Sequence, residues 1–346
     1  MPESIGLAYV SQHVALVRLK RGVILPEWIA YLALSSVGKT YLEAQGYGGT
    51  KVQLSLEDIA RLPIVCPPLS EQVAIVSFLD RETAKIDALV EAQQRLIELL
   101  REKRQAIIAH AVTKGLDSSA PTKNSDADWL GSIPSHWRVL PLKRVVVTVS
   151  GSTPNKDRRD FWSGEIPWAS AKDLKKDSIS DTQDHISKTA IDESGAAIAK
   201  AGSVLVLVRG MMLARLFPVT TTLVPMSFNQ DLKALSGVDG MLDEYLPWLL
   251  RGMERETLNR LDEAGHGTKA LRMGAWLSMA VPVPPEDEQR EIVRALGEQL
   301  DRIDSLVVGA SAAASLLQER RAALISAAVT GKIDVREASA RDAEAA

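Results

Sequence analysis

An internal repeat constrains this chain more than any other feature, because a segment that occurs twice must take up the same local structure twice. Pro67–Asp117 aligns without a gap with Pro284–Asp334, and 21 of the 51 positions are identical. Upstream, the match continues at an offset of 218 residues, which pairs Ser11-Gln12 with Asn229-Gln230. We therefore expect one and a half copies of a unit. The second copy contains about 100 residues that have no counterpart in the first.

Each repeated segment predicts one long helix. Residues 72–113 and 289–330 both follow a Pro-Pro pair, which ends the element before it. Apolar residues recur in a two-position heptad seam with polar interruptions, as in a coiled coil. The seam of the first helix comprises Leu79, Ile86, Gln93, Leu100 and Ile107 together with Ile75, Glu82, Leu89, Leu96 and Lys103. Helices of about 40 residues span about 60 Å. A globular segment separates the two, so we expect an antiparallel pair that acts as a spacer.

The other segments complete an α+β protein, in which globular domains of mixed α/β structure are joined by two long antiparallel coiled-coil helices. Strand-like runs at 144–149 and 203–208 and a helical pattern at 242–261 support the mixed class. We expect the C-terminal part of a first domain (1–66), the first helix segment (67–117), a polar linker (118–127), a second domain (128–283), the second helix segment (284–334) and a disordered tail (335–346).

Composition excludes several classes of protein. Cys66 is the single cysteine, so neither a disulfide framework nor a multi-cysteine zinc site can form, and we expect a reducing, cytoplasmic compartment. The longest uncharged apolar stretch, Ser305–Leu317, is too short to cross a bilayer, and the N-terminus lacks a signal-peptide layout. A formal net charge of −3 excludes a uniformly basic nucleic-acid binder but leaves room for a local basic surface.

Signatures of catalysis are weak. The five histidines fall at no metal-ligand spacing and no Gly-x-Ser-x-Gly elbow occurs, so we expect no metal and no cofactor. Gly38-Lys39-Thr40 resembles part of a relaxed phosphate-binding loop, but Pro26–Leu34 before it looks helical, and that loop requires a buried strand there. A helix end followed by a glycine stop is the alternative. The sequence favours a binding or scaffold protein over an enzyme.

Basic residues gather in loops of the second domain, where lysine and arginine could neutralise phosphates and polar side chains could bond to phosphates or base edges. Asp128–Val283 nevertheless holds 19 Lys and Arg against 18 Asp and Glu, so a solvated surface of mixed charge remains an open alternative.

Several segments of the sequence match one known family: Trp129–Pro134 with His136-Trp137, Gly151–Pro154 with Trp162–Trp168, Asn229–Leu232, Gly267-Thr268-Lys269 and each Pro-Pro segment that opens a helix ending in Ala-Val-Thr. Through these segments the chain resembles the specificity subunit of type I restriction–modification enzymes. The resemblance covers nearly the whole chain.

The resemblance implies a subunit without catalytic residues of its own. In the family, two target-recognition domains each recognise one half of a bipartite DNA site. The helices set the spacer length and dock modification subunits, which methylate adenine, and a restriction subunit adds translocation and cleavage. The candidate DNA contacts are Thr153, Lys156, Arg158, Lys172, Arg209, Gln230, Lys269 and Arg272, with Lys51 and Gln53 in the first domain.

The chain departs from the family pattern in its first domain, where counterparts of the block Gly151–Asp173 are missing. We expect that this partial domain cannot recognise a half-site alone and leaves apolar surface exposed. Two such chains could self-associate through their helices and offer two second domains to a symmetric site. The alternatives are a scaffold that only binds modification subunits and a nucleotide-binding enzyme that uses Gly38-Lys39-Thr40.

Overall fold

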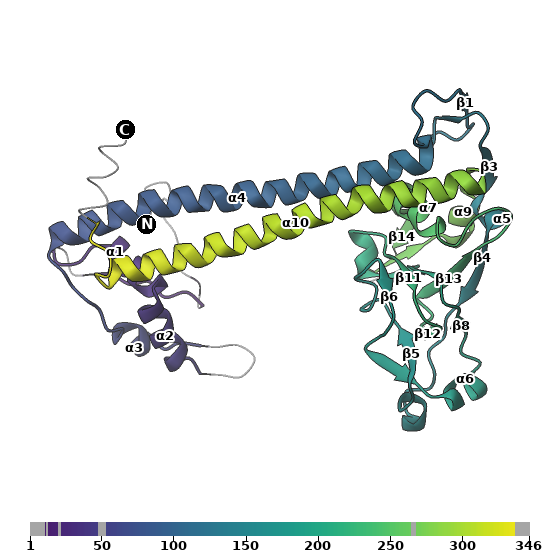
Figure 1. Ribbon diagram of the computed structural model, residues 1–346. Coiled ribbons are helices and arrows are strands. Elements are labelled where there is room, and N and C mark those ends of the chain that lie inside the picture. The colour runs from purple at the N-terminus through teal and green to yellow at the C-terminus, as the bar shows by residue number, and fades with distance from the viewer. Residues whose placement is uncertain (1–10, 12, 20–21, 48–52, 264–267, 336–346) are drawn as a thin grey trace. The chain divides into compact units, whose positions relative to one another are not determined.

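The computed structural model describes residues 11, 13–19, 22–47, 53–263 and 268–335. Contacts divide the chain into two compact units: unit 1 combines residues 1–99 with 306–346, and unit 2 comprises residues 100–305. Two long helices, α4 (Leu69–Lys114) and α10 (Glu286–Val329), each contribute one end to each unit (Figure 1). The two predicted helices are thus confirmed, and the mixed α+β class with them. The predicted disordered tail lies largely outside the described residues.

Within each unit the two helices run antiparallel. In unit 1, Arg321 Nε lies 2.8 Å from Asp87 Oδ1, and in unit 2, Arg104 Nε lies 3.3 Å from Asp304 Oδ1. The step from Asp87 to Arg104 runs forward along α4, and the equal step from Arg321 to Asp304 runs backward along α10. The pairing register is therefore the same in both units.

The second of the two predicted seam positions is buried at Ile75, near the start of α4, but not farther along the helix. Leu79, Ile86 and Leu100 are at most 8% exposed, whereas Leu89 and Leu96 of the other position are 51% and 43% exposed. The two-position seam is therefore wrong along this stretch of α4. A single buried row suffices where two helices meet along one line, and the second apolar row is left facing outward.

Unit 1 contains three short helices beside the long ones: α1 (Pro26–Leu34), α2 (Ser36–Gln45) and α3 (Leu56–Ala60). Their main core joins α1 to both long helices and includes Trp28, Leu79, Ile325 and Val329. The indole Nε1 of Trp28 also donates to Val65 O at 2.9 Å, so α1 is fixed by apolar and polar contacts together.

Gly38 corrects both interpretations of the sequence around it. It lies inside α2, where an added Cβ would clash with the backbone oxygen of Leu32, so glycine is needed for the close approach of α1 and α2. The element before α2 is a helix and not a buried strand, so the phosphate-loop hypothesis for Gly38-Lys39-Thr40 is wrong. The glycine-stop interpretation is wrong as well.

Unit 2 is built around a five-stranded sheet in the order β4-β13-β9-β11-β6 (Figure 1). Its central strand β9 (Val204–Leu207) is buried at all four positions, as expected for a strand covered on both faces. Its other strands are β4 (Val146–Ser150), β13 (Leu232–Gly237), β11 (Val219–Thr222) and β6 (Ser178–Ile179). The strand-like sequences at 144–149 and 203–208 are thus largely confirmed, although residues 142–145 form the short helix α5.

Smaller sheets complete the domain. A four-stranded sheet has the order β7-β5-β12-β8, a three-stranded sheet has the order β10-β15-β14, and two pairs join β16 to β3 and β1 to β2. Their strands are β5 (Ile166–Ala169), β7 (Asp184–Ile186), β8 (Ile198–Ala199), β12 (Met226–Phe228), β10 (Arg209–Gly210), β14 (Leu261–Glu263), β15 (Lys269–Leu271), β16 (Ala280–Val283), β3 (Arg138–Pro141), β1 (Thr122–Asn124) and β2 (Ser132–Pro134).

Two local predictions are corrected here. The polar linker 118–127 contains a strand, β1, which pairs antiparallel with β2. The helical pattern at 242–261 forms two short helices, α7 (Leu246–Gly252) and α8 (Glu254–Leu258), and Leu261 already belongs to strand β14. The unit also contains α6 (Lys188–Ser194), α9 (Met273–Leu277) and the 3₁₀ turns η1 (Arg159–Trp162) and η2 (Met211–Ala214).

A buried glutamine joins the start of each long helix to its globular neighbour. Gln289 Nε2 donates to Gly240 O at 2.6 Å and to Pro284 O at 2.9 Å, and its Oε1 accepts from Leu242 N at 2.9 Å. In unit 1, Gln72 makes the same three contacts. Its partners are Val23 O, Pro67 O and Leu25 N. Both glutamines are fully buried. The repeat therefore preserves a joint as well as a helix.

A second joint in unit 2 is ionic. Arg251 on α7 donates to the backbone oxygens of Asp177 and Val219, both at 3.0 Å, and Arg104 on α4 lies 2.7 Å from Asp177 Oδ2. Burial lowers the pKa of Arg251, whose charge Asp177 stabilises. The loop before β6 is thereby fixed to the end of α4 in this unit.

Candidate nucleic-acid interface

Four backbone segments of unit 2 meet at one edge of the central sheet. Strand β4 ends at this edge, β13 begins there and β9 ends there, because the three strands are antiparallel neighbours that pair Lys233 with Ser150 and Leu232 with Leu207. We call this region the loop edge, and it comprises residues 151–153, 208–210, 229–231 and 269–271.

Backbone hydrogen bonds hold the loop edge together. Ser152 N donates to Phe228 O at 2.9 Å, Val208 N donates to Asp231 O at 2.8 Å, and Leu271 N donates to Val208 O at 2.8 Å. Gly151 lets two of the segments approach, because a Cβ at this position would clash with the backbone oxygens of Phe228 and Asn229. The edge is thus a set of backbones fixed to a buried sheet.

Four of the predicted contacts lie on the loop edge: Thr153, Arg209, Gln230 and Lys269. The hydroxyl of Thr153 donates to Gln230 Oε1, so these two polar side chains are brought together from loops 77 residues apart. Arg209 pairs with Ala270 and Gly210 with Lys269 in the β10–β15 ladder. The sequence predicted these residue types, and the structure brings them to one edge.

The cations of this region differ in how strongly they are already paired. Lys269 Nζ lies 2.7 Å from Glu263 Oε1, which lowers the pKa of that carboxyl, and Arg272 Nε lies 3.5 Å from Asp262 Oδ1. Arg209 is exposed, and no ion pair is found for it among the described residues. Of the cations at this edge, Arg209 therefore has the guanidinium most available for an external phosphate or base.

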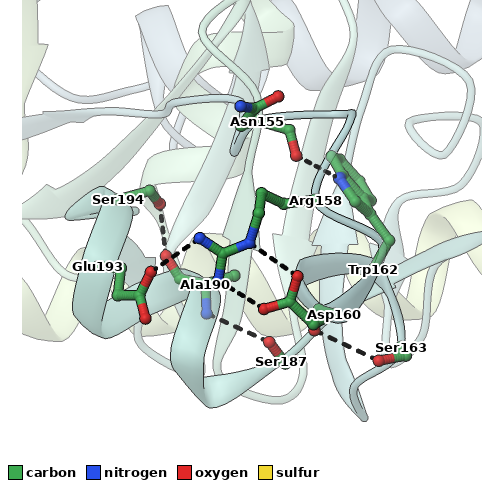
Figure 2. Close-up of polar contacts among 9 residues, drawn as sticks. All are labelled: Asn155, Arg158, Asp160, Trp162, Ser163, Ser187, Ala190, Glu193 and Ser194. Atoms are coloured by element: carbon green, nitrogen blue, oxygen red, sulfur yellow. Dashed lines mark hydrogen bonds and ion pairs between the residues drawn. The ribbon is translucent and has the colours of Figure 1, made fainter.

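Arg158 lies in the loop that follows Thr153, and carboxylates already surround it. Figure 2 shows its guanidinium between Asp160 and Glu193, with Nε and Nη2 at 2.8 and 2.6 Å from the two oxygens of Asp160. Glu193 Oε2 lies 3.3 Å from Nη1, and the guanidinium carbon lies 4.2 Å from the centre of the Phe161 ring. The hydrogen bonds to Asp160 raise the pKa of Arg158 and lower the pKa of Asp160. In this structure, Arg158 stabilises the conformation of its own loop through these ion pairs.

Lys156 lies in the same loop and differs from Arg158. Trp162 Nε1 donates to Asn155 O at 3.1 Å (Figure 2), and Asp157 N donates to Asn155 Oδ1 at 2.9 Å, so the turn is fixed on both sides. The side chain of Lys156 is exposed, and the described residues include no carboxylate in an ion pair with it. A fixed turn with an unpaired ammonium group suits a phosphate contact.

The remaining candidates lie elsewhere. Lys172 Nζ lies 2.7 Å from Asp184 Oδ2, which places it at the sheet that contains β7. Gln53 belongs to unit 1, where its backbone forms an isolated bridge with Tyr47. Lys51 lies outside the described residues. Of these three residues, the structure therefore places only Lys172 within unit 2, at a sheet other than the central one.

Sequence reasoning missed the residues that join the second domain to the long helices. The joint formed by Gln289 had a visible signal, because glutamine recurs at this place in both copies of the repeat. The ionic joint of Arg104, Asp177 and Arg251 had none, because 73 residues separate Arg104 from Asp177 and the first copy of the repeat has no counterpart of Asp177 to compare. Within the described part of the chain, no cluster of three His, Cys, Asp or Glu side chains could bind a metal, and no helix is long and apolar enough to cross a membrane.

Comparisons with known proteins agree with this architecture. The chain is 28% identical over 254 residues to the type I restriction enzyme EcoR124I/EcoR124II specificity subunit of Escherichia coli, a match that covers 71% of this chain and 56% of that protein. It is 27% identical over 179 residues to the type I restriction enzyme MjaIX specificity subunit of Methanocaldococcus jannaschii, covering 51% of this chain and 40% of that protein. The chain thus spans about half the length of these curated relatives.

A solved structure shares the fold. A chain from a study of complex assembly and conformational transition in the type I R-M system superposes with a TM-score of 0.71 at 19% identity, covering 90% of this chain and 73% of that chain. The model of the type I restriction modification DNA specificity domain matches residues 4–99 and 134–307, well over half of the sequence. The chain therefore belongs to the family of type I restriction modification DNA specificity domains.

Proposed function

We propose that this chain is the sequence-specific DNA recognition subunit of a type I restriction–modification complex, and that the loop edge of unit 2 contacts one half of a bipartite target. One observation carries the proposal. Segments from four places in the sequence converge on one edge of a buried sheet and bring Thr153, Gln230, Arg209 and Lys269 together. A surface that reads bases must hold its side chains in fixed register, and a sheet edge provides that support.

The charges on this surface suit two kinds of contact. Lys156 and Arg209 are exposed cations that could neutralise phosphates, or, for arginine, bond to a guanine edge. Thr153 and Gln230 supply neutral donors and acceptors for base edges or phosphates. Lys172 and Arg158 already bind carboxylates, and DNA would have to displace these partners. We therefore rank Arg209 and Lys156 above Arg158 and Lys172 as DNA contacts.

The long helices would provide the platform for partner subunits. In unit 1, apolar side chains between 43% and 69% exposed follow both helices: Leu89, Leu96 and Leu99 on α4, and Leu306, Val308 and Leu316 on α10. Exposed apolar rows of this kind mark protein interaction surfaces. Modification subunits that methylate adenine would dock here, a restriction subunit would join them, and this chain would add recognition without catalytic residues of its own.

The deciding experiment is a modified-base map of host DNA with and without this chain, in cells that keep the neighbouring modification subunit. We expect an adenine-methylated split motif that disappears with the chain and also with an Arg209→Glu variant. Lys200→Glu is the matched control. It reverses an exposed charge at the opposite end of β9 and should preserve the motif.

A second function is favoured by the exposed apolar residues on the long helices of unit 1. It is a scaffold that binds modification subunits without recognising DNA. Two results together would support the scaffold and contradict DNA recognition. Methylation would be unchanged in cells that lack the chain, and the chain itself would still bind modification subunits. A symmetric motif would indicate two chains that offer two second domains, and an asymmetric motif would indicate a further recognition half.

A further inference from the structure

Among the large apolar side chains described for unit 2, that of Met211 is the most exposed, at 72%. Met211 is the first residue of the turn η2 and directly follows Gly210, where the loop edge segment 208–210 ends. A single exposed apolar side chain is common on protein surfaces, so its exposure gains meaning only from where the residue lies. Met211 lies two residues from Arg209, the most available cation of the loop edge.

The backbone around Met211 is fixed on both sides. Before it, Gly210 belongs to β10, which pairs antiparallel with β15. After it, the side chain of Leu213 is 1% exposed, and Arg215 N donates to Met212 O at 3.0 Å. The turn therefore offers an apolar side chain from a fixed backbone, and a surface that distinguishes one base from another needs such support.

The chemistry of Met211 differs from that of the candidate contacts beside it. Arg209, Thr153 and Gln230 can form hydrogen bonds with phosphates or with the polar atoms of base edges. A methionine thioether is only a weak acceptor, so it suits an apolar group of the ligand. The base edges of B-DNA offer such a group in the C5 methyl of thymine, which lies in the major groove. Arginine contacts guanine in the same groove, so Arg209 and Met211 together suit a guanine and a thymine that lie close to each other.

We propose that Met211 is a specificity-determining residue, which contacts the C5 methyl of a thymine in the target DNA. The inference rests on the proposed function, because it requires DNA at the loop edge. An apolar protein surface is a poorer partner, because it would bury the neighbouring guanidinium of Arg209, for which the described residues supply no ion pair. A wedge between stacked bases is also less favourable, because it has the cost of unstacking them, whereas contact with a methyl group leaves the stack intact.

The test measures DNA binding by the full chain assembled with its modification subunits, on duplexes that contain the target given by the modified-base map. Each thymine of the target is replaced in turn by uracil, which pairs identically but lacks the C5 methyl. We expect one replacement to weaken binding about four-fold, as burial of one methyl group predicts. Met211→Gln keeps a side chain of similar length and makes its end polar, so this variant should bind thymine and uracil duplexes equally. Met211→Leu should keep the difference between them.

Leu223→Gln is the matched control. Leu223 is 57% exposed and follows β11 at the end of the central sheet opposite the loop edge, so this variant should distinguish thymine from uracil as the unmodified chain does. Unchanged hydrogen exchange of the Leu271 amide, which donates to Val208 O, shows that the loop edge is folded in each variant.

Equal binding of thymine and uracil duplexes by the unmodified chain at every position would overturn the proposal, as would a difference that Met211→Gln retains. Without a thymine–uracil difference, a fall in the fluorescence of an adenine analogue in the target caused by Met211→Gln would indicate a wedge. Weaker binding of modification subunits by Met211→Gln, again without that difference, would assign Met211 to a protein contact.

Arg209→Glu separates these failures from failure of the proposed function. If Arg209→Glu weakens DNA binding while thymine and uracil duplexes bind equally, only the role of Met211 is wrong. If Arg209→Glu also leaves DNA binding unchanged, recognition of DNA by the loop edge is wrong as well.

Discussion

Gly252 on α7 lies directly against Val112 on α4 in unit 2. A Cβ at position 252 would clash with Cγ2 of Val112 and lie 3.4 Å from the Cα of Ala109. The glycine therefore sets how closely the globular domain approaches the helix in this unit. Val112 is fully buried, so its side chain cannot move aside without cost.

Gly252→Ala should destabilise unit 2 by about 1–3 kcal/mol, because the added methyl group overpacks this contact. Gly297→Ala is the matched control: position 297 lies inside α10, and an added Cβ there meets nothing within 4 Å. The control should stabilise by about 0.5–1 kcal/mol, since alanine favours a helix over glycine. Urea denaturation of both variants measures the difference. Equal effects of the two substitutions would contradict the tight contact.

Gln289→Ala should destabilise the junction between α10 and the second domain by about 1–3 kcal/mol, because it removes a partner from the buried Pro284 O and from the partly buried Leu242 N and Gly240 O. Hydrogen exchange should show the loss as faster exchange of the Leu242 amide. Glu291→Ala changes an exposed neighbour two residues along α10 and should leave this amide unchanged. Slow exchange at Leu242 in the Gln289→Ala chain would show that the joint is held by other contacts.

Gln72→Ala tests whether the joint of unit 1 works in the same way. The prediction is faster exchange at Leu25, whose amide donates to Gln72 Oε1 at 3.0 Å, with no effect on Leu242. Each glutamine should therefore act on its own unit. A shared response of both amides to one substitution would contradict two independent joints.

Arg209→Glu should weaken binding of cognate DNA by about ten-fold or more, and should reduce the slope of log affinity against log salt by about 1. The measurement uses the full chain bound to its modification subunits, titrated with DNA at several salt concentrations. Lys200→Glu makes the same charge change at the other end of β9 and should leave cognate affinity within about two-fold, because it lies away from the loop edge. Comparable losses in both variants would indicate a nonspecific effect of charge.

The carboxyl of Asp160 should titrate below its ordinary pKa of 3.8, because Arg158 hydrogen-bonds to its ionised form. A group whose pKa is lowered on folding stabilises the fold above its unfolded pKa, and this contribution is lost as the pH falls through the lower folded value. The loop 155–163 should therefore loosen only in acid, below about pH 4. Carboxyl NMR titration checks the pKa, and Arg158→Gln should return it towards 3.8. A pKa that ignores this substitution would contradict the assigned cause.

Much of the helical architecture could be predicted from the sequence. The repeat predicts two long helices with nearly the bounds that the structure shows, and the sequence predicts a helix over the residues that form α1. The heptad pattern failed at Leu89 and Leu96, because apolar spacing alone does not tell a row that faces the partner helix from a row that faces outward. Strand β1 was missed because Thr122–Asn124 is exposed and polar, with no alternation to reveal it.

The candidate site was less predictable. Residue types and loop positions identified Arg209 and Lys269, but their proximity depends on a pairing between β10 and β15 that links residues about 60 positions apart. Arg158 looked like Arg209 in the sequence. It differs in the structure because Asp160 and Glu193 come close to it, and Glu193 lies on another element, α6. Local sequence cannot reveal which cations tertiary structure has already neutralised.

The two glutamine joints have a consequence for how such chains can change. Gln72 and Gln289 bind backbone carbonyl and amide groups, which are present whatever side chains the neighbouring loops contain. Attachment to the helix through these bonds is therefore insensitive to which side chains lie at the surface of the domain. A gene segment transferred between related chains at this point would bring backbone groups that can bind the same glutamine. New surfaces could therefore be acquired by recombination while the hydrogen bonds between helix and domain are kept.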